Sequence, residues 1–308
     1  MQELININEY PVKDMLPMLL KDKTTKCNII FATDAYSGSK HNITAKTQIT
    51  PYLLQGFDSC EIQPRVSKTA EEQNERTRKK AEVFTPSWIC NKMNNHCDAE
   101  WFGREDVFNI EKEHAWETTT EPVSFNKKED WKKYVDSRRL EITCGEAPYI
   151  VSRYDAATGE RIPVNQRIGI LDRKLRIINE NTDSEKDWIK WTIRAYQSVY
   201  GYEFQGDNLL IARINLLITF VEYMNDRWNR NPSDDELRKV TNIIVWNFWQ
   251  MDGITGTVPF GKPQEEYHQM SLFDFAVGIN DTEPESLNCK VYDWRSNESI
   301  TYSSLRKG

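Results

Sequence analysis

The fold is decided by the stretch Arg139-Leu-Glu-Ile-Thr-Cys-Gly145, an apolar segment that ends in a small-residue turn, with Ala147 two residues further on. A second such segment, Val199-Tyr-Gly-Tyr-Glu203, ends in an acid, and apolar residues recur behind it at helical spacing. In a doubly wound α/β domain, ligands bind beyond the carboxyl ends of the strands, where glycine lets a backbone approach closely. The two segments therefore predict an α/β fold with a ligand site beside Gly145 and Glu203.

Two further segments flank this pair in the sequence. Phe84-Thr-Pro86 lies upstream, after a highly charged stretch that is expected to be helical. Downstream, Thr241–Asp252 reads as a strand that delivers Asp252 to the ligand edge, and Gly253 begins a glycine-containing loop. Binding groups often lie on such loops.

Taken in order, these segments resemble the S-adenosylmethionine-dependent DNA adenine-N6 methyltransferases of the gamma order, the modification enzymes of restriction systems. The resemblance covers roughly residues 75 to 255. It implies a doubly wound, mostly parallel, Rossmann-like sheet of the seven-strand methyltransferase type, with an N-terminal α/β extension. It also implies S-adenosylmethionine as cofactor and DNA as partner, with a specificity or restriction subunit as a further partner.

The resemblance assigns roles to individual positions. The Phe-Thr-Pro loop would contact the methionine end of the donor, Glu203 its ribose and Asp252 the region of its adenine. The cofactor-binding residues implied in this way are Phe84, Thr85, Pro86, Glu141, Thr143, Gly145, Ala147, Glu203, Phe204, Asp252 and Gly253.

The chain departs from the family pattern in its glycine loop and in its length. Ala147 stands where the family usually has a second glycine, and Tyr149 where it has phenylalanine. A plain βαβ unit needs only about 30 residues. The longer separation of Glu141 from Glu203 predicts that residues 153–196 hold an inserted hairpin and helices, one of them at residues 184–199.

The segment that would hold the target base also departs from the family. Family members use an Asn/Asp/Ser-Pro-Pro-aromatic tetrapeptide, and the chain contains none. The nearest local sequence is Thr257-Val-Pro259-Phe260, which makes Thr257, Pro259 and Phe260 the catalytic candidates. By position, the expected strand is Leu272–Gly278, which is followed by Ile279-Asn-Asp281 without prolines.

Composition restricts where the chain acts and how it could contact DNA. The 308 residues carry a formal net charge of −7, so any DNA contact must be local. The candidates are Arg76, Arg78, Lys79 and Lys80, with Arg65 and Lys68 upstream, although a short basic run is often only a solvated helix face. No run approaches the about 18 apolar residues of a membrane span, and the N-terminus lacks a secretory pattern, so a cytoplasmic protein is expected.

The cysteines and histidines do not predict a metal site. Six cysteines without closely paired spacing are expected to be reduced thiols. Cys90, His96 and Cys97 are the one cluster, and an amphipathic helix over residues 87–95 explains it better than zinc. Three parts are expected: an N-terminal module at 1–70, a donor-binding domain at 71–281 and a C-terminal tail at 282–308.

The sequence leaves two main hypotheses for the function. A third hypothesis is an unrelated nucleotide-binding α/β protein. The first is a site-specific DNA adenine-N6 methyltransferase, or the methylase subunit of a restriction-modification system. Methyl transfer from a sulfonium needs alignment in a dry pocket rather than acid–base residues. The alternative is a catalytically inert S-adenosylmethionine-binding module that docks a partner chain carrying the DNA-reading part.

Overall fold

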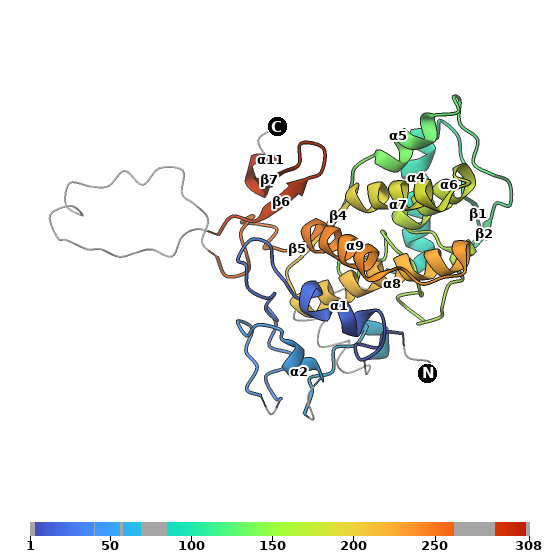
Figure 1. Cartoon of the computed structure of the whole chain (residues 1–308). Helices are drawn as coiled ribbons and strands as arrows, with labels where there is room; N and C mark the ends of the chain where they lie inside the picture. The colour runs from blue at the N-terminus through green and yellow to red at the C-terminus, as the bar shows by residue number, and fades with distance from the viewer. Residues whose placement is uncertain (1–3, 40, 56–57, 69–84, 262–286, 306–308) are drawn as a thin grey trace.

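A short parallel sheet forms the centre of the computed structural model, which describes residues 4–39, 41–55, 58–68, 85–261 and 287–305 (Figure 1). Its strands are β3 (Arg139–Ile142), β4 (Val199–Glu203) and β5 (Phe248–Gln250), in the order β3-β4-β5. Arg139 pairs with Val199, and Gly201 with Phe248. Because all three strands are parallel, their carboxyl ends lie at one edge of the sheet.

Helices fill the connections between these strands. Between β3 and β4 lie η2 (Val164–Gln166), α6 (Ile170–Asn181) and α7 (Glu185–Gln197). An isolated bridge between Tyr154 and Arg161 precedes them, so the expected insertion is confirmed. The long helix α8 (Gly206–Trp228) follows β4 directly, as its spacing predicted, and almost all of its first three turns are buried.

Helix α9 (Asp234–Asn247) corrects the strand expected at residues 241–252. Ser233, followed by three acids, is a sequence pattern typical of a helix start. It forms a capping box with Glu236, and Ser233 Oγ accepts from Glu236 N at 3.3 Å. The β-branched run after Val240 suggested a strand, but its apolar residues continue the buried helical face that begins at Leu237. Only Phe248–Gln250 is extended.

The N-terminal segment contains α1 (Val12–Leu19), α2 (Pro51–Gln55) and η1 (Arg65–Ser67) and shares one hydrophobic core with the sheet and its helices. Helix α1 packs on α8 and α9, as Figure 1 shows. The apolar run Asn28-Ile-Ile-Phe-Ala32 predicts a buried strand, which is not formed. Ile29 and Phe31 are buried, but this stretch makes isolated bridges, such as Ile30 to Gln48.

The guanidinium of Arg213 joins these parts in the core. This side chain is 0% exposed and donates to the carbonyl oxygens of Leu19, Lys21, Val245 and Phe248. Burial lowers its pKa to about 10, so it still carries its charge at neutral pH. One cation therefore holds the end of α1 and the start of β5 against α8.

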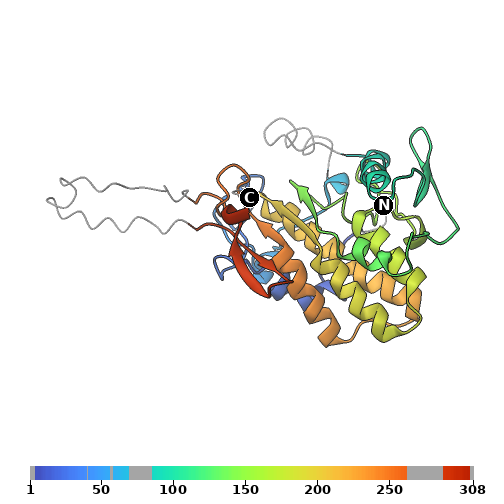
Figure 2. The ribbon, with the colours of Figure 1, turned by 90° about the horizontal axis from the view of Figure 1, so that it is seen from above.

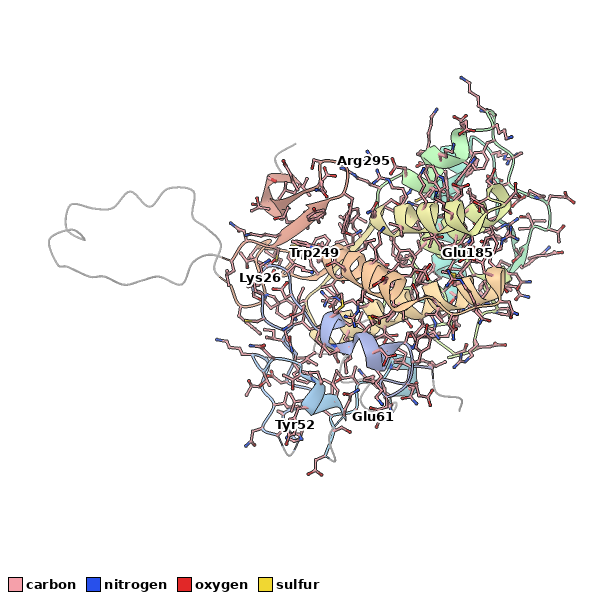
Figure 3. The ribbon with its side chains drawn as sticks, viewed as in Figure 1. Lys26, Tyr52, Glu61, Glu185, Trp249 and Arg295 are labelled. Atoms are coloured by element: carbon pink, nitrogen blue, oxygen red, sulfur yellow. The ribbon has the colours of Figure 1, made fainter. Side chains whose placement is uncertain are left out.

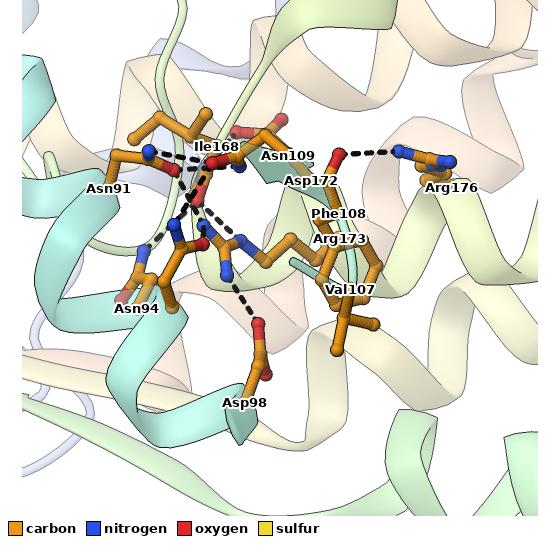
Figure 4. Close-up of polar contacts among 12 residues, drawn as sticks. Asn91, Asn94, Asp98, Val107, Phe108, Asn109, Ile168, Asp172, Arg173 and Arg176 are labelled. Atoms are coloured by element: carbon orange, nitrogen blue, oxygen red, sulfur yellow. Dashed lines mark hydrogen bonds and ion pairs between the residues drawn. The ribbon is translucent and has the colours of Figure 1, made fainter. Parts of the chain in front are cut away.

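Helix α4 (Ser87–Phe102) is held by a second buried guanidinium (Figure 4). Arg173 on α6 pairs with Asp98 and donates to Asn91 Oδ1 and to the carbonyl oxygen of Ile168. Asn91 in turn exchanges amide hydrogen bonds with Asn109 on β1 (Asn109–Glu111). The helix expected over residues 87–95 is thus confirmed and runs on to Phe102.

The remaining elements lie at the periphery. The hairpin β1 and β2 (Trp116–Thr118) and helix α5 (Asp130–Asp136) flank α4 and α6. Arg230 binds Glu185 and Glu236 and so links the starts of α7 and α9; Glu185 is labelled in Figure 3. The sequence Cys289-Lys-Val-Tyr-Asp-Trp-Arg295 predicts a strand in the tail, and this is confirmed as β6 (Lys290–Asp293). It pairs with β7 (Glu298–Thr301), which precedes α11 (Tyr302–Leu305).

The fold class agrees with the sequence in part. The chain is α/β with a parallel sheet, but that sheet has three strands in the part of the chain that the structure describes, rather than seven. The helix expected at residues 71–80 and the strand at 272–278 lie outside the described residues. None of the described helices is long and apolar enough to cross a membrane.

We predict that Arg213→Met lowers the free energy of unfolding by about 2 to 4 kcal/mol, because it leaves buried carbonyl groups without a donor. Urea denaturation followed by circular dichroism measures the change. Arg238→Met is the control, since its exposed ion pair with Asp234 contributes little. Equal midpoints for the two variants would show that Arg213 does not hold the core together.

Candidate functional site

The first two strands of the sheet are joined at their carboxyl ends by a hydrogen bond between the two sequence candidates. The N–H of Gly145, three residues after β3, donates to Glu203 Oε2 at 3.0 Å. The parallel register brings them together, because Ile142 pairs with Tyr202. A glycine turn and an acid that are far apart in the chain therefore meet at one point.

The carboxylate of Glu203 is held by backbone amides. Its Oε1 accepts from Phe204 N at 3.0 Å and from Gln205 N at 3.1 Å, and the residue is only 6% exposed. These amides precede the first turn of α8, where the helix dipole favours negative charge. The carboxylate is thus preorganised by backbone donors.

The loop after β3 has the backbone conformation of a glycine loop. Gly145 has φ +50° and Ala147 has φ +65°, both in the left-handed region. Glycine reaches this region without strain, which agrees with a glycine being usual at position 147 in the family that the chain resembles. On β4, a Cβ at Gly201 would lie 2.8 Å from Cys144 Cβ, so glycine lets this loop sit directly against the neighbouring strand.

Glu141 is a buried carboxylate with an oxygen that is not satisfied. Its Oε1 accepts from Tyr149 N at 3.4 Å, whereas Oε2 has no hydrogen-bond partner among the described residues. Burial, together with the nearby Glu203 carboxylate, raises the pKa of Glu141 well above its usual range. A buried acid destabilises a protein unless a cation or a hydrogen-bond donor satisfies it. Acids with shifted pKa values cluster at functional sites.

The Phe-Thr-Pro segment reaches this loop through Tyr149. Thr85 lies beside the Tyr149 hydroxyl, whose pKa is raised by burial and by the neighbouring Cys90. Asn94 on α4 donates to Tyr149 O at 3.0 Å, which fixes the loop against the helix that begins at Ser87. Thr85 and Pro86 are half-buried at this junction, and Phe84 lies outside the described residues.

Asp252 and Gly253 follow β5 at the same edge. Met251 N donates to Glu203 O at 3.0 Å, so Asp252 lies one residue beyond this contact. The Oδ1 of Asp252 accepts from Ile254 N and Thr255 N and thereby closes a turn. A Cβ at Gly253 would lie 2.8 Å from the Tyr202 hydroxyl, so glycine is the residue that fits there.

The three catalytic candidates differ in exposure. Thr257 is 0% exposed, and its hydroxyl bonds Thr255 Oγ1 at 2.8 Å and Val258 O at 3.1 Å. Pro259 is buried as well. Phe260 is 50% exposed and meets the ring of Phe204 edge to face, with centroids 5.7 Å apart. Only the aromatic ring of this tetrapeptide is therefore open to a ligand, and it contacts Phe204, the residue that follows Glu203.

Sequence reasoning missed two residues that shape the site. Gln250 Nε2 donates to Phe204 O and to Ile30 O, both at 2.8 Å, and this fixes the N-terminal segment beside the end of β4. Asn94 anchors the Tyr149 loop as described. Both are polar residues in apolar surroundings, and nothing in their sequence spacing marks them as site residues.

The basic candidates are divided by the structure. Arg65 is 7% exposed, and the Lys68 side chain, 8% exposed, lies 3.6 Å from Asp207. These two upstream cations face inward, so the expectation that they support DNA contact is wrong. The other four, Arg76, Arg78, Lys79 and Lys80, lie outside the described residues.

The cysteine cluster does not form a metal site within the described segments, where no group of three or more suitable ligands occurs. Cys90 is fully buried, and burial raises the pKa of its thiol. His96 is exposed beside Glu100, and Cys97 is half-buried. The cysteines of the described part are all free thiols.

Comparisons of the chain with protein-family models, with curated proteins and with solved structures found no match.

We predict that Glu141→Gln stabilises the ligand-free protein more at pH 8 than at pH 5. Because the folded-state pKa of Glu141 is raised, the native state binds a proton more tightly than the unfolded state above pH 4.5. The contribution of Glu141 to folding stability therefore falls as the pH rises from 4.5 through the raised pKa of the folded state. Glutamine does not ionise, so the variant does not lose stability at this position as the pH rises.

Urea midpoints at both pH values measure the effect, with the exposed Glu105→Gln as control. A Glu141→Gln variant that is less stable than the parent at pH 8 would mean that the carboxylate is paired and charged in the native state.

Proposed function

We propose that this chain binds S-adenosylmethionine at the carboxyl ends of β3 and β4 and acts as a site-specific DNA adenine-N6 methyltransferase, or as the methylase subunit of a restriction-modification system. One observation carries the proposal. Thr85, Glu141, Gly145 and Glu203 come from three distant stretches and are linked by the contacts of Tyr149 and of the Gly145 amide. This is the order and grouping that the sequence resemblance implies.

The residues present suit the donor in chemistry. Glu203 is a carboxylate, which is the kind of group that binds ribose hydroxyls, and it is already oriented by three amides. Glu141 has a buried oxygen without a donor, and an ammonium group is the partner such an oxygen lacks. The left-handed loop at Gly145 lets backbone atoms approach a ligand closely. When bound, the cofactor supplies the methyl group.

The rings of Phe204 and Phe260 support a nucleic-acid substrate. An exposed aromatic face offers a base about 1 to 3 kcal/mol of stacking. A base that is methylated on its exocyclic amine must first leave the duplex, and a stacking surface offsets part of that cost. Phe260 is half exposed and lies beside the residue that follows Glu203, so a base stacked there would be close to the donor.

The second candidate is a catalytically inert donor-binding module that docks a DNA-reading partner. The observation that favours it is the state of Thr257, the only side-chain acceptor in the tetrapeptide. Its hydroxyl is buried and bonded within its own turn, so it offers nothing to an exocyclic amine. Methyl transfer and donor binding must therefore be measured separately.

We predict that Glu203→Ala weakens binding of S-adenosylmethionine by at least about 1 to 3 kcal/mol, because a charged hydrogen-bond acceptor is lost. Isothermal titration calorimetry measures the affinity, and circular dichroism checks that the variant is folded. Glu117→Ala, an exposed acid on β2, is the control. An unchanged affinity in the folded Glu203→Ala variant removes this residue from the site.

We predict that the protein transfers radiolabelled methyl groups from S-adenosylmethionine to unmethylated DNA and that Phe260→Ala reduces transfer at least tenfold, with donor affinity little changed. Tyr52→Ala removes an aromatic ring that is 72% exposed, on α2, and is the matched control (Figure 3). Donor binding without transfer, under conditions that include a specificity subunit, would favour the inert module. Absence of donor binding would overturn both candidates.

A further inference from the structure

Strand β3 has one edge that faces away from β4. Arg139 N donates to Ser198 O at 2.9 Å, so Arg139 and Glu141 direct their backbone groups towards β4. Successive residues of a strand direct their backbone N–H and C=O groups to alternate sides of the strand. Leu140 and Ile142 therefore direct theirs away from β4. No strand of the described residues pairs there. Figure 2 shows β3 as a green arrow at the margin of the sheet.

The side chains beside this edge are apolar and uncovered. Leu140 is 44% exposed and Ile142 is 62% exposed. Both lie on the face of the sheet that carries their register partners on β4, Tyr200 and Tyr202. Parallel strands are usually buried on both faces, and here the other face holds the buried Glu141. The face of β3 that carries Leu140 and Ile142 is therefore an exposed apolar surface.

An apolar groove continues from this face. It lies between the sheet and the β6–β7 hairpin, and its lining includes Arg138, Leu140, Tyr200, Tyr292, Ile300 and Leu305. Natural edges are usually protected by lysine, proline or a bulge, because an open edge pairs with other chains. The four residues of β3 contain no lysine or proline, whereas β6 begins with Lys290.

The charges at the start of β3 indicate what kind of strand fits. Arg138 is paired with Asp293 at 2.8 Å. Arg139 lies over the ring of Trp101 at 5.8 Å and has no carboxylate partner among the described residues. A second copy of the chain would bring another pair of arginines to this edge. An extended strand with an acidic residue opposite Arg139 complements it.

We infer that the open edge of β3 binds an extended strand of a partner polypeptide, with apolar side chains on the face of Leu140 and Ile142 and a carboxylate near Arg139. Backbone hydrogen bonds to Leu140 and Ile142 supply affinity in this mode, and the alternate side chains supply specificity. A strand bound here ends beside Gly145 if it runs parallel to β3. The inference rests on the geometry of β3 and does not depend on the proposed methyl transfer.

The test uses the peptide fluorescein-Glu-Val-Thr-Val-Thr-Val-amide, which carries the label on its N-terminus and is titrated with the full chain in the absence of methyl donor. Fluorescence anisotropy is expected to show saturable binding. Leu140→Lys and Ile142→Lys should each weaken it at least tenfold, because lysine blocks edge pairing. Ile254→Lys is the control, since Ile254 is 88% exposed and lies beyond β5.

A second probe keeps the protein unchanged. The same peptide with all of its valine and threonine amides N-methylated cannot donate to the edge in either strand direction, and its affinity for the parent chain should fall at least tenfold. Equal affinity of the two peptides, or no saturable binding up to millimolar protein, overturns the inference. A dimer of the chain that Ile142→Lys converts to a monomer also overturns it and assigns the edge to a second copy.

Discussion

The buried guanidinium of Arg213 is the contact on which the rest of the structure depends. A cation in an apolar core is costly unless its donors are satisfied, and here the acceptors are carbonyl groups from the end of α1 and from the junction of α9 with β5. The same side chain therefore determines where β5 enters the sheet and where the N-terminal segment packs. Gln250 and Ile30 then meet beside the end of β4.

Arg173 acts in the same way on the other side of the site. By binding Asp98 and Asn91 it fixes α4 on α6, and this places Thr85 at the Tyr149 loop. The result is an edge where two acids lie close together, one of them satisfied by amides and the other lacking a donor for one oxygen. Such a combination is expected of a binding site, because structural acids are normally fully paired.

Much of the local structure followed from the sequence. The periodicity of α8, the Ser233 cap of α9 and the short apolar segments that became β3 and β4 could all be recognised from their patterns. Residues 241–247 could not, since a β-branched run is compatible with either a strand or a buried helix, and only packing against α8 selects the helix. The stretch at residues 28–32 also looked like a strand, but its only ladder partners are isolated ones.

The sequence by itself determined the α/β class, the glycine turn at Gly145 and the acid at the end of β4, because these depend on local propensity and on the direction of the chain. Only the tertiary structure decided that Glu203 accepts from Gly145, that Glu141 is buried with an unsatisfied oxygen, and that Lys68 faces Asp207. It also decided that no strand of the described residues pairs with the outer edge of β3. Hydrogen bonding, burial and strand pairing are relations between residues distant in the chain, and composition and spacing along one segment do not contain them.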